Sequence, residues 1–178
     1  MDFGYLFDEC GTMSALDRRR LASPIRLSLA SKLGGDLDGA WWPHSASVAR
    51  ELPELIDALR ERLGEVIDIG VNWSSLDGVP DLDLLSRIAA IPGHQVRHQR
   101  VMTVTGSLAR VNLLVVPSRT TRALAVMLLR QAATLPILPM HLDAPVCRAA
   151  DDIVRAARAE SALRGRPAAS STLRSSIT

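Results

Sequence analysis

The sequence predicts an α+β fold, with one layer of mostly antiparallel sheet (about four to five strands), two main helices and a C-terminal tail helix. Three observations predict it. Apolar and polar residues alternate in several short segments, as they do in half-buried strands. Two further strand-like segments flank a tight turn at Thr105-Gly106-Ser107, which is typical of a hairpin. Few helical segments separate the strands, whereas parallel strands need crossover helices. A small mixed sheet is the alternative.

A chain of 178 residues, 47% hydrophobic and 22% charged, suits one soluble domain with tails. We predict a flexible tail over residues 1–23, a single α+β domain over 24–145, a tail helix over 146–164 and a disordered end over 165–178. The last segment is a mixture of Ser, Arg, Pro and Ala, which is too poor in apolar residues to form a core.

The first half of the domain predicts a strand, a turn, a second extended segment and a helix. Ile25, Leu27 and Leu29 alternate with less apolar residues, and a turn rich in Gly and Asp follows over 31–39. The extended segment ends at Pro43. The helix carries apolar residues at intervals of three and four, with Ser45 or Ser47 as the cap and Gly64 just past its end. Pro53 predicts a kink or a later start of that helix. The apolar face comprises Val48, Leu52, Leu55, Ile56, Leu59 and Leu63.

The second half predicts three strands and two helices. The strand over 67–73 alternates cleanly and places Trp73 in the core; strands over 95–104 and 109–116 follow. Because the last of these is apolar on both faces, we expect it to be central. Pro117 ends it, and Ser118 or Thr120 caps a helix whose face is Leu124, Met127 and Leu128. A helical pattern over 151–163 either docks on the body or forms an arm.

No motif predicts a catalytic centre, a metal site or a cofactor. His94 and His98 have the spacing of zinc ligands on a helix, but in the predicted strand they lie about 13 Å apart. Asp36-Leu37-Asp38-Gly39 resembles part of a calcium loop, yet the position of the bidentate acid is Ser45. A plain turn is the better interpretation. Asp77, Asp81 and Asp83 are interpreted as turn and cap residues.

The adjacent pair Trp41-Trp42 is the strongest candidate for a site, in a chain with only 3% aromatic residues. In an extended segment, neighbouring side chains point to opposite faces. One indole therefore enters the core, and the other faces solvent, a partner or a covered second layer. Tryptophan is enriched in binding pockets. The alternative is that one indole is core and the other is covered by the helix and the tail. The candidate ligand-binding residues are Asp38, Trp41, Trp42, His44 and Arg100.

Three blocks of the sequence carry a family resemblance. These are DGAWWPHS (38–45), ELPELIDALRERLG (51–64) and VNLLVVPSRT (111–120). Together they resemble an uncharacterised actinobacterial family, a domain of unknown function with a DGAWWPxS signature, over about residues 24–133. The resemblance implies no activity, ligand or catalytic residue. It implies an actinobacterial, soluble, intracellular setting.

These observations favour a small binding or regulatory module over an enzyme, with an unknown small molecule or protein as its partner. One alternative is a small enzyme whose catalytic residues are scattered in sequence. Another is a nucleic-acid accessory protein that uses its arginine-rich ends. Those ends contain Arg18, Arg19 and Arg20, and Arg155, Arg158, Arg164, Arg166 and Arg174.

The sequence also predicts a cytoplasmic protein without a membrane segment. The longest apolar stretch, 123–142, is interrupted by Arg130, Pro136 and Pro139, so it falls short of a membrane span. The two cysteines do not form a disulfide framework. The N-terminus is acidic instead of carrying the basic start of a secretory signal.

Overall fold

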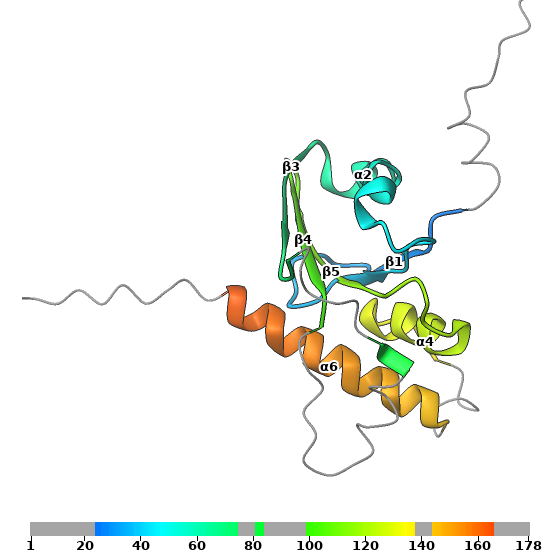
Figure 1. Ribbon diagram of the computed structural model, residues 1–178. Coiled ribbons are helices and arrows are strands. Elements are labelled where there is room, and N and C mark those ends of the chain that lie inside the picture. Colours follow the sequence, from blue (N-terminus) through cyan, green and yellow to red (C-terminus); the bar gives the residue numbers. More distant parts are fainter. Residues whose placement is uncertain (1–23, 75–80, 84–98, 138–143, 166–178) are drawn as a thin grey trace, which may run out of the picture.

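The computed structural model describes residues 24–74, 81–83, 99–137 and 144–165, which form an α+β fold with a five-stranded sheet and three helices (Figure 1). The predicted tail over 1–23 lies outside the described residues, as do His94, His98 and residues 166–178 of the end predicted to be disordered from 165, whereas Gly165 is the last residue of α6. The elements, in chain order, are β1 (Leu27–Leu29), β2 (Gly39–Trp41), α2 (Val48–Leu63), β3 (Val66–Val71), β4 (Val101–Gly106), β5 (Arg110–Val115), α4 (Arg122–Ala132) and α6 (Pro145–Gly165).

The strand order in the sheet is β1-β2-β5-β4-β3, and the predicted α+β class is confirmed. The pairs β1–β2, β4–β5 and β3–β4 are antiparallel, whereas β2 and β5 are parallel, with Trp41 opposite Val115. The predicted hairpin is the β4–β5 pair. The segment expected to be central is β5, and its side chains from Leu113 to Val116 are at most 2% exposed.

Helices cover both faces of the sheet, α2 on one face and α4 with α6 on the other (Figure 1). Successive residues of a strand point to opposite faces, so β2 and β5 contribute to two separate cores. The α2 face contains Trp41, Leu113 and Val115 together with Leu55, Leu59 and Leu63 of the helix. The opposite face contains Trp42, Leu114 and Val116 together with Leu124, Leu128, Ile153 and Val154.

Helix α2 begins where the sequence predicts, after Ser47, although the Ser47 side chain makes no capping hydrogen bond. Glu51 in the first turn instead accepts hydrogen bonds from the backbone N–H groups of His44 (2.7 Å) and Ser45 (2.6 Å). Pro53 lies inside the helix, so the expectation of a later start is wrong. Gly64 ends the helix with a φ of 72°, and its N–H donates to the Arg60 carbonyl.

The apolar face predicted for β3 is correct only in part. Ile69 and Trp73 pack against the α2-side core as expected, whereas Ile67 is 70% exposed and Val71 is 42% exposed. The pairing of β3 with β4 shifts between Val66 and Asp68, which leaves Ile67 as an extra residue. Such a bulge interrupts the alternation of the strand, so a side chain expected in the core points outward.

Three boundaries in the second half also differ from the prediction. Strand β4 begins at Val101, and the residues predicted as strand before Gln99 lie outside the described ones. The strand continues through Gly106, whose N–H donates to the Ala109 carbonyl, so the turn lies later than expected. The N-cap of α4 is Thr121 and not Ser118 or Thr120.

Helix α6 docks on the body and does not form an arm. Ile153, Val154 and Ala157 are at most 1% exposed and pack against α4. Farther along the helix, Glu160 accepts hydrogen bonds from the Asn72 side chain (2.9 Å) and the Gln99 N–H (3.1 Å). Apolar packing near its middle and polar contacts near its end therefore both fix α6 to the sheet.

Candidate functional site

The candidate site is a cavity at the carboxyl ends of β2 and β5. Because these two strands are parallel, the chain leaves both at the same edge of the sheet. The Val116 N–H donates to the Trp41 carbonyl (2.8 Å), which holds the two ends together. In α/β proteins, ligands commonly bind where parallel strands end and helices begin.

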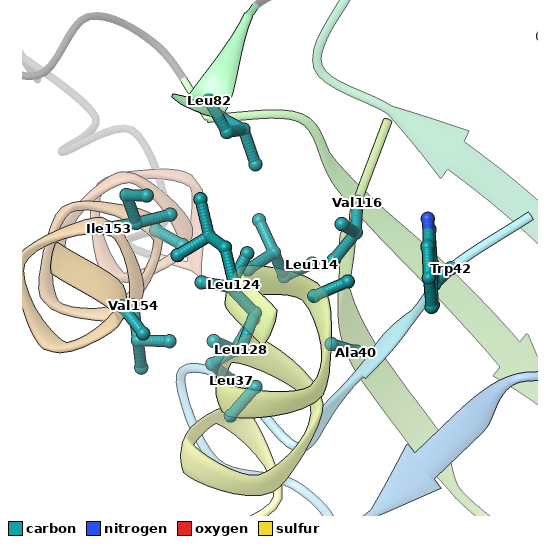
Figure 2. Packing of buried hydrophobic residues seen from close by; sticks show 14 of the residues in the cluster. Leu37, Ala40, Trp42, Leu82, Leu114, Val116, Leu124, Leu128, Ile153 and Val154 are labelled. Atoms are coloured by element: carbon teal, nitrogen blue, oxygen red, sulfur yellow. The ribbon is translucent and has the colours of Figure 1, made fainter. Parts of the chain in front are cut away.

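The cavity has a volume of about 480 Å³, which lies within the range of small-molecule sites. Three separate segments form it: the loop before α2, residues 81–83, and the loop that joins β5 to α4. Leu82 anchors the middle segment, because it is 2% exposed and belongs to the core beside α4 (Figure 2). The lining residues are Ala46, Asp81, Leu82, Asp83, Pro117, Ser118, Arg119, Thr120 and Thr121.

The N-terminus of α4 forms one wall of the cavity. Thr121 is its N-cap, but the Thr121 side chain makes no capping bond, and the first turn contains no acidic residue. Asp83 accepts hydrogen bonds instead from the Thr121 N–H (2.9 Å) and the Thr121 hydroxyl (2.7 Å). Asp83 therefore holds the residue that begins α4, which lies 38 positions later in the chain.

Two buried polar groups lie at this end of the sheet without a hydrogen-bond partner among the described residues. One is the hydroxyl of Thr120, a cavity residue that is 6% exposed. The other is the indole N–H of Trp42, which is 9% exposed. Figure 2 shows the indole of Trp42 beside Val116, with its nitrogen at the end of the ring on the same side as Leu82. Buried polar groups nearly always have a partner, so a bound molecule or water fits here.

The two adjacent tryptophans point to opposite faces of the sheet, as the sequence predicts. Trp41 is 1% exposed in the α2-side core, and Trp42 lies in the core beside α4. Trp42 is in the covered second layer and does not face solvent. The Arg26 guanidinium lies 3.6 Å from its ring centroid and donates hydrogen bonds to the carbonyls of Trp42 and Pro43. Partial burial lowers the pKa of Arg26, while the charge of Glu51 acts in the opposite direction.

The other three predicted site residues do not line this cavity. Asp38 precedes β2 and therefore lies at the opposite end of this strand from the cavity. It is 1% exposed, and its carboxylate accepts hydrogen bonds from the backbone N–H groups of Gly35 (2.7 Å) and Asn112 (2.9 Å). The turn expected at Asp38-Gly39 lies earlier in the chain, because Gly39 is already the first residue of β2. The carboxylate of Asp38 is directed at backbone amides.

His44 and Arg100 lie on different elements and are not brought together with Asp38. His44 is exposed in the loop before α2, and its ring Nε2 lies 3.3 Å from the Pro24 carbonyl. Arg100 precedes β4, and its guanidinium lies 5.4 Å from the ring centroid of Trp73. The five predicted ligand-binding residues are thus spread over both faces of the sheet and both ends of its strands.

Three arginines of α6 make contacts within the chain. Arg155 pairs with Asp151 and Asp152, whereas Arg158 donates to the Gln131 carbonyl and Arg164 to the Val71 carbonyl. Arg18, Arg19, Arg20, Arg166 and Arg174 lie outside the described residues. In the part of the chain that is described, no helix has the length and apolar character needed to cross a membrane.

Sequence reasoning missed the cavity because its residues come from three segments. Asp81, Asp83, Ser118 and Thr120 were each recognisable as turn or cap residues, yet nothing local indicates that they meet. The available signal was the block VVPSRTTR, in which a buried strand ends at Pro117 and hydroxyl and arginine side chains precede a helix.

Comparison with known proteins adds a family but no activity. Neither a search of curated proteins nor a search of solved structures found a match. A model of a family of unknown function (DUF5994) matches residues 26–132, which run from just before β1 to the end of α4 and include every residue that lines the cavity. The match covers more than half of the chain, and the protein therefore belongs to the DUF5994 family.

Proposed function

We propose that this protein is a non-catalytic binding module whose small-molecule ligand occupies the cavity at the carboxyl ends of β2 and β5, next to Trp42. The observation that carries the proposal is the buried Thr120 hydroxyl, which lines the cavity and has no partner among the described residues. An unsatisfied buried hydroxyl costs about 1–3 kcal/mol, and a ligand that hydrogen bonds to it recovers part of that cost.

The geometry supports binding in two further ways. Apolar residues, among them Leu82 and Pro117, share the cavity wall with hydroxyl and charged groups, which is the mixture found in sites for small molecules. Two of the elements around it are also well packed: β5 is central in the sheet, and α4 is buried through Leu124 and Leu128. A site on such a scaffold is preorganised, so little ordering opposes binding. The cytoplasmic, actinobacterial setting predicted from the sequence belongs to the same proposal.

A cavity-filling substitution tests the proposal. Ala46 and Ala49 are both exposed and lie three residues apart, but only Ala46 lines the cavity. A panel of common metabolites, neutral and charged, is screened by the amide chemical shifts of residues 118–121 in the full chain. We expect at least one compound to shift these signals in the wild type and in Ala49→Trp, and to lose its effect in Ala46→Trp.

Two results would contradict the proposal. In the first, no compound of the panel shifts these amides. In the second, Ala46→Trp binds the same compounds as Ala49→Trp, which would place their binding outside the cavity. If a compound is chemically converted during the measurement, the protein is an enzyme whose catalytic residues are scattered in the sequence, and not a binding module.

A further inference from the structure

We infer that the ligand of this cavity carries an oxyanion group, such as the phosphate of a small phosphate ester, held at the N-terminus of α4. The inference rests on the proposed function and names the chemical class of its ligand. It stands on a buried hydroxyl in the cavity wall, on the helix N-terminus that begins there, and on a carboxylate that already lies against this helix end.

The helix end supplies backbone donors and a positive potential. The N–H groups in the first turn of an α-helix have no acceptor within the helix, and the helix dipole is positive at this end. In α4 these are the amides of Arg122, Ala123 and Leu124, and neither the N-cap side chain nor an acidic residue of the first turn satisfies them. Helix N-termini of this kind bind phosphate and carboxylate groups.

The second observation is the buried Thr120 hydroxyl, since it lies in the loop that leads into this helix and lines the same cavity. A hydroxyl can donate to an anionic oxygen. The Trp42 indole N–H, which is only a donor, lies without a partner on the same face and at the same edge of the sheet. Groups that can all donate are matched by a ligand that accepts, and an oxyanion accepts several hydrogen bonds at once.

Asp83 shows that an oxyanion is stable at this helix end. Both oxygens of its carboxylate accept hydrogen bonds from Thr121, one from the N–H and one from the hydroxyl. The two bonds go to the N-cap residue and not to the amides of the three residues that follow it. The Asp83 carboxylate therefore lies at the edge of the proposed anion site.

Among the residues that line the cavity, two carboxylates outnumber one arginine, and Arg122 at the start of α4 balances the formal charge. Asp81 and Asp83 line the cavity and oppose an anion, whereas Arg119 lines the cavity and Arg122 begins the helix. Both arginines are exposed, and neither takes part in an ion pair among the described residues. Two formal charges of each sign offset one another, which leaves the helix dipole as the remaining positive contribution.

The test is a titration of the full chain with three probes: inorganic phosphate, glycerol 3-phosphate and glycerol. Binding is followed by calorimetry and by the amide shifts of residues 118–124. We expect both phosphates to shift these amides and glycerol to leave them unchanged. Raising the salt concentration should weaken the binding of both phosphates, because the site is partly open to solvent and its charges are screened.

Three substitutions connect the binding to the proposed donors. Arg119→Gln should weaken phosphate binding about tenfold, whereas Arg110→Gln, which makes the same charge change at the opposite end of β5, should alter it less than about twofold. Thr120→Val should weaken binding severalfold without lowering the stability of the ligand-free protein, because the hydroxyl has no partner to lose. Asp83→Asn should tighten binding, since it removes a negative charge beside the site.

Each other outcome overturns the inference. No phosphate binding, or equal effects of Arg119→Gln and Arg110→Gln, means that α4 holds no anion site. Suppose that phosphate does not bind, and that glycerol or another neutral compound binds to the wild type but not to Ala46→Trp. The proposed binding module is then supported, and the assignment of its ligand as an oxyanion is wrong. If phosphate binds with the same affinity to the wild type, Thr120→Val and Ala46→Trp, it is attracted only to the arginines on the surface and does not enter the cavity.

Discussion

Asp38 and Asn112 exchange two hydrogen bonds across the parallel pair of β2 and β5. The Asp38 N–H donates to the Asn112 carbonyl (2.8 Å), and the Asn112 N–H donates to Asp38 Oδ2 (2.9 Å). The same carboxylate accepts from the Gly35 N–H, and the Asn112 side chain donates to the Gly35 carbonyl. A residue that the sequence singled out for ligand binding thus fastens the turn before β2 to the centre of the sheet.

Asp38→Ala should therefore lower the free energy of unfolding by about 2–4 kcal/mol, because two backbone N–H groups lose their acceptor in a buried place. Asp36→Ala is the matched control. Asp36 is exposed in the same turn, and its removal should cost less than about 0.5 kcal/mol. Urea denaturation measures both. Equal losses in the two variants would show that Asp38 acts only through the charge of the turn.

Trp42→Ala should lower the free energy of unfolding by about 3–5 kcal/mol, because its indole is buried among Leu114, Val116 and Leu124. Trp42→Phe should cost much less, about 1–2 kcal/mol, since it keeps most of the apolar contact and removes an N–H without an acceptor among the described residues. Thermal or chemical unfolding checks both values. A Phe variant as unstable as the Ala variant would mean that the indole N–H is satisfied in solution.

Gly39→Ala should disrupt the β1–β2 pair. A Cβ at Gly39 would lie 2.1 Å from the backbone carbonyl oxygen of Ser28, which cannot move without separating the two strands. We expect a loss of about 3 kcal/mol or failure to fold. In contrast, a Cβ at Gly70 meets nothing within 4 Å, so Gly70→Ala should change stability by less than about 1 kcal/mol. A tolerated Gly39→Ala variant would refute this close approach.

Glu160→Ala should loosen the end of α6 by removing the acceptor of the Gln99 N–H and one of two acceptors of the Asn72 side-chain amide, which also donates to the Gln99 carbonyl. We expect a loss of about 1–3 kcal/mol in unfolding free energy and faster hydrogen exchange of the Gln99 amide. Asp151→Ala, which removes an exposed partner of Arg155, should cost less than about 0.5 kcal/mol. An unchanged exchange rate at Gln99 would show that apolar packing alone holds α6.

Alternation and burial made much of the fold predictable. The run Val111 to Val116 is apolar at every position except Asn112, and only a strand covered on both faces accommodates that pattern. The opposite orientation of Trp41 and Trp42 followed from the two-residue period of extended chain. Ile67 could not be placed correctly, because a bulge depends on how β3 pairs with β4 and leaves no local signal.

The site was less predictable because tertiary contacts decide it. Asp38 has a polar side chain in a Gly-rich turn, and the sequence does not reveal that Asn112, 74 residues later, supplies its partner. The covering of Trp42 by Arg26 depends in the same way on the pairing of β1 with β2. Asp83 and Thr121 meet only because the parallel pairing of β2 with β5 places the start of α4 at this edge.

The single parallel pair in the described sheet also has a consequence for folding kinetics. The β1–β2 and β3–β4–β5 units consist of antiparallel neighbours and can nucleate separately, while β2 and β5 must close a loop of about 70 residues. Joining the two units is then the slow event. A compound that binds where β2 and β5 end side by side would slow global unfolding. It would not affect the β1–β2 and β4–β5 pairs that form before the two units join.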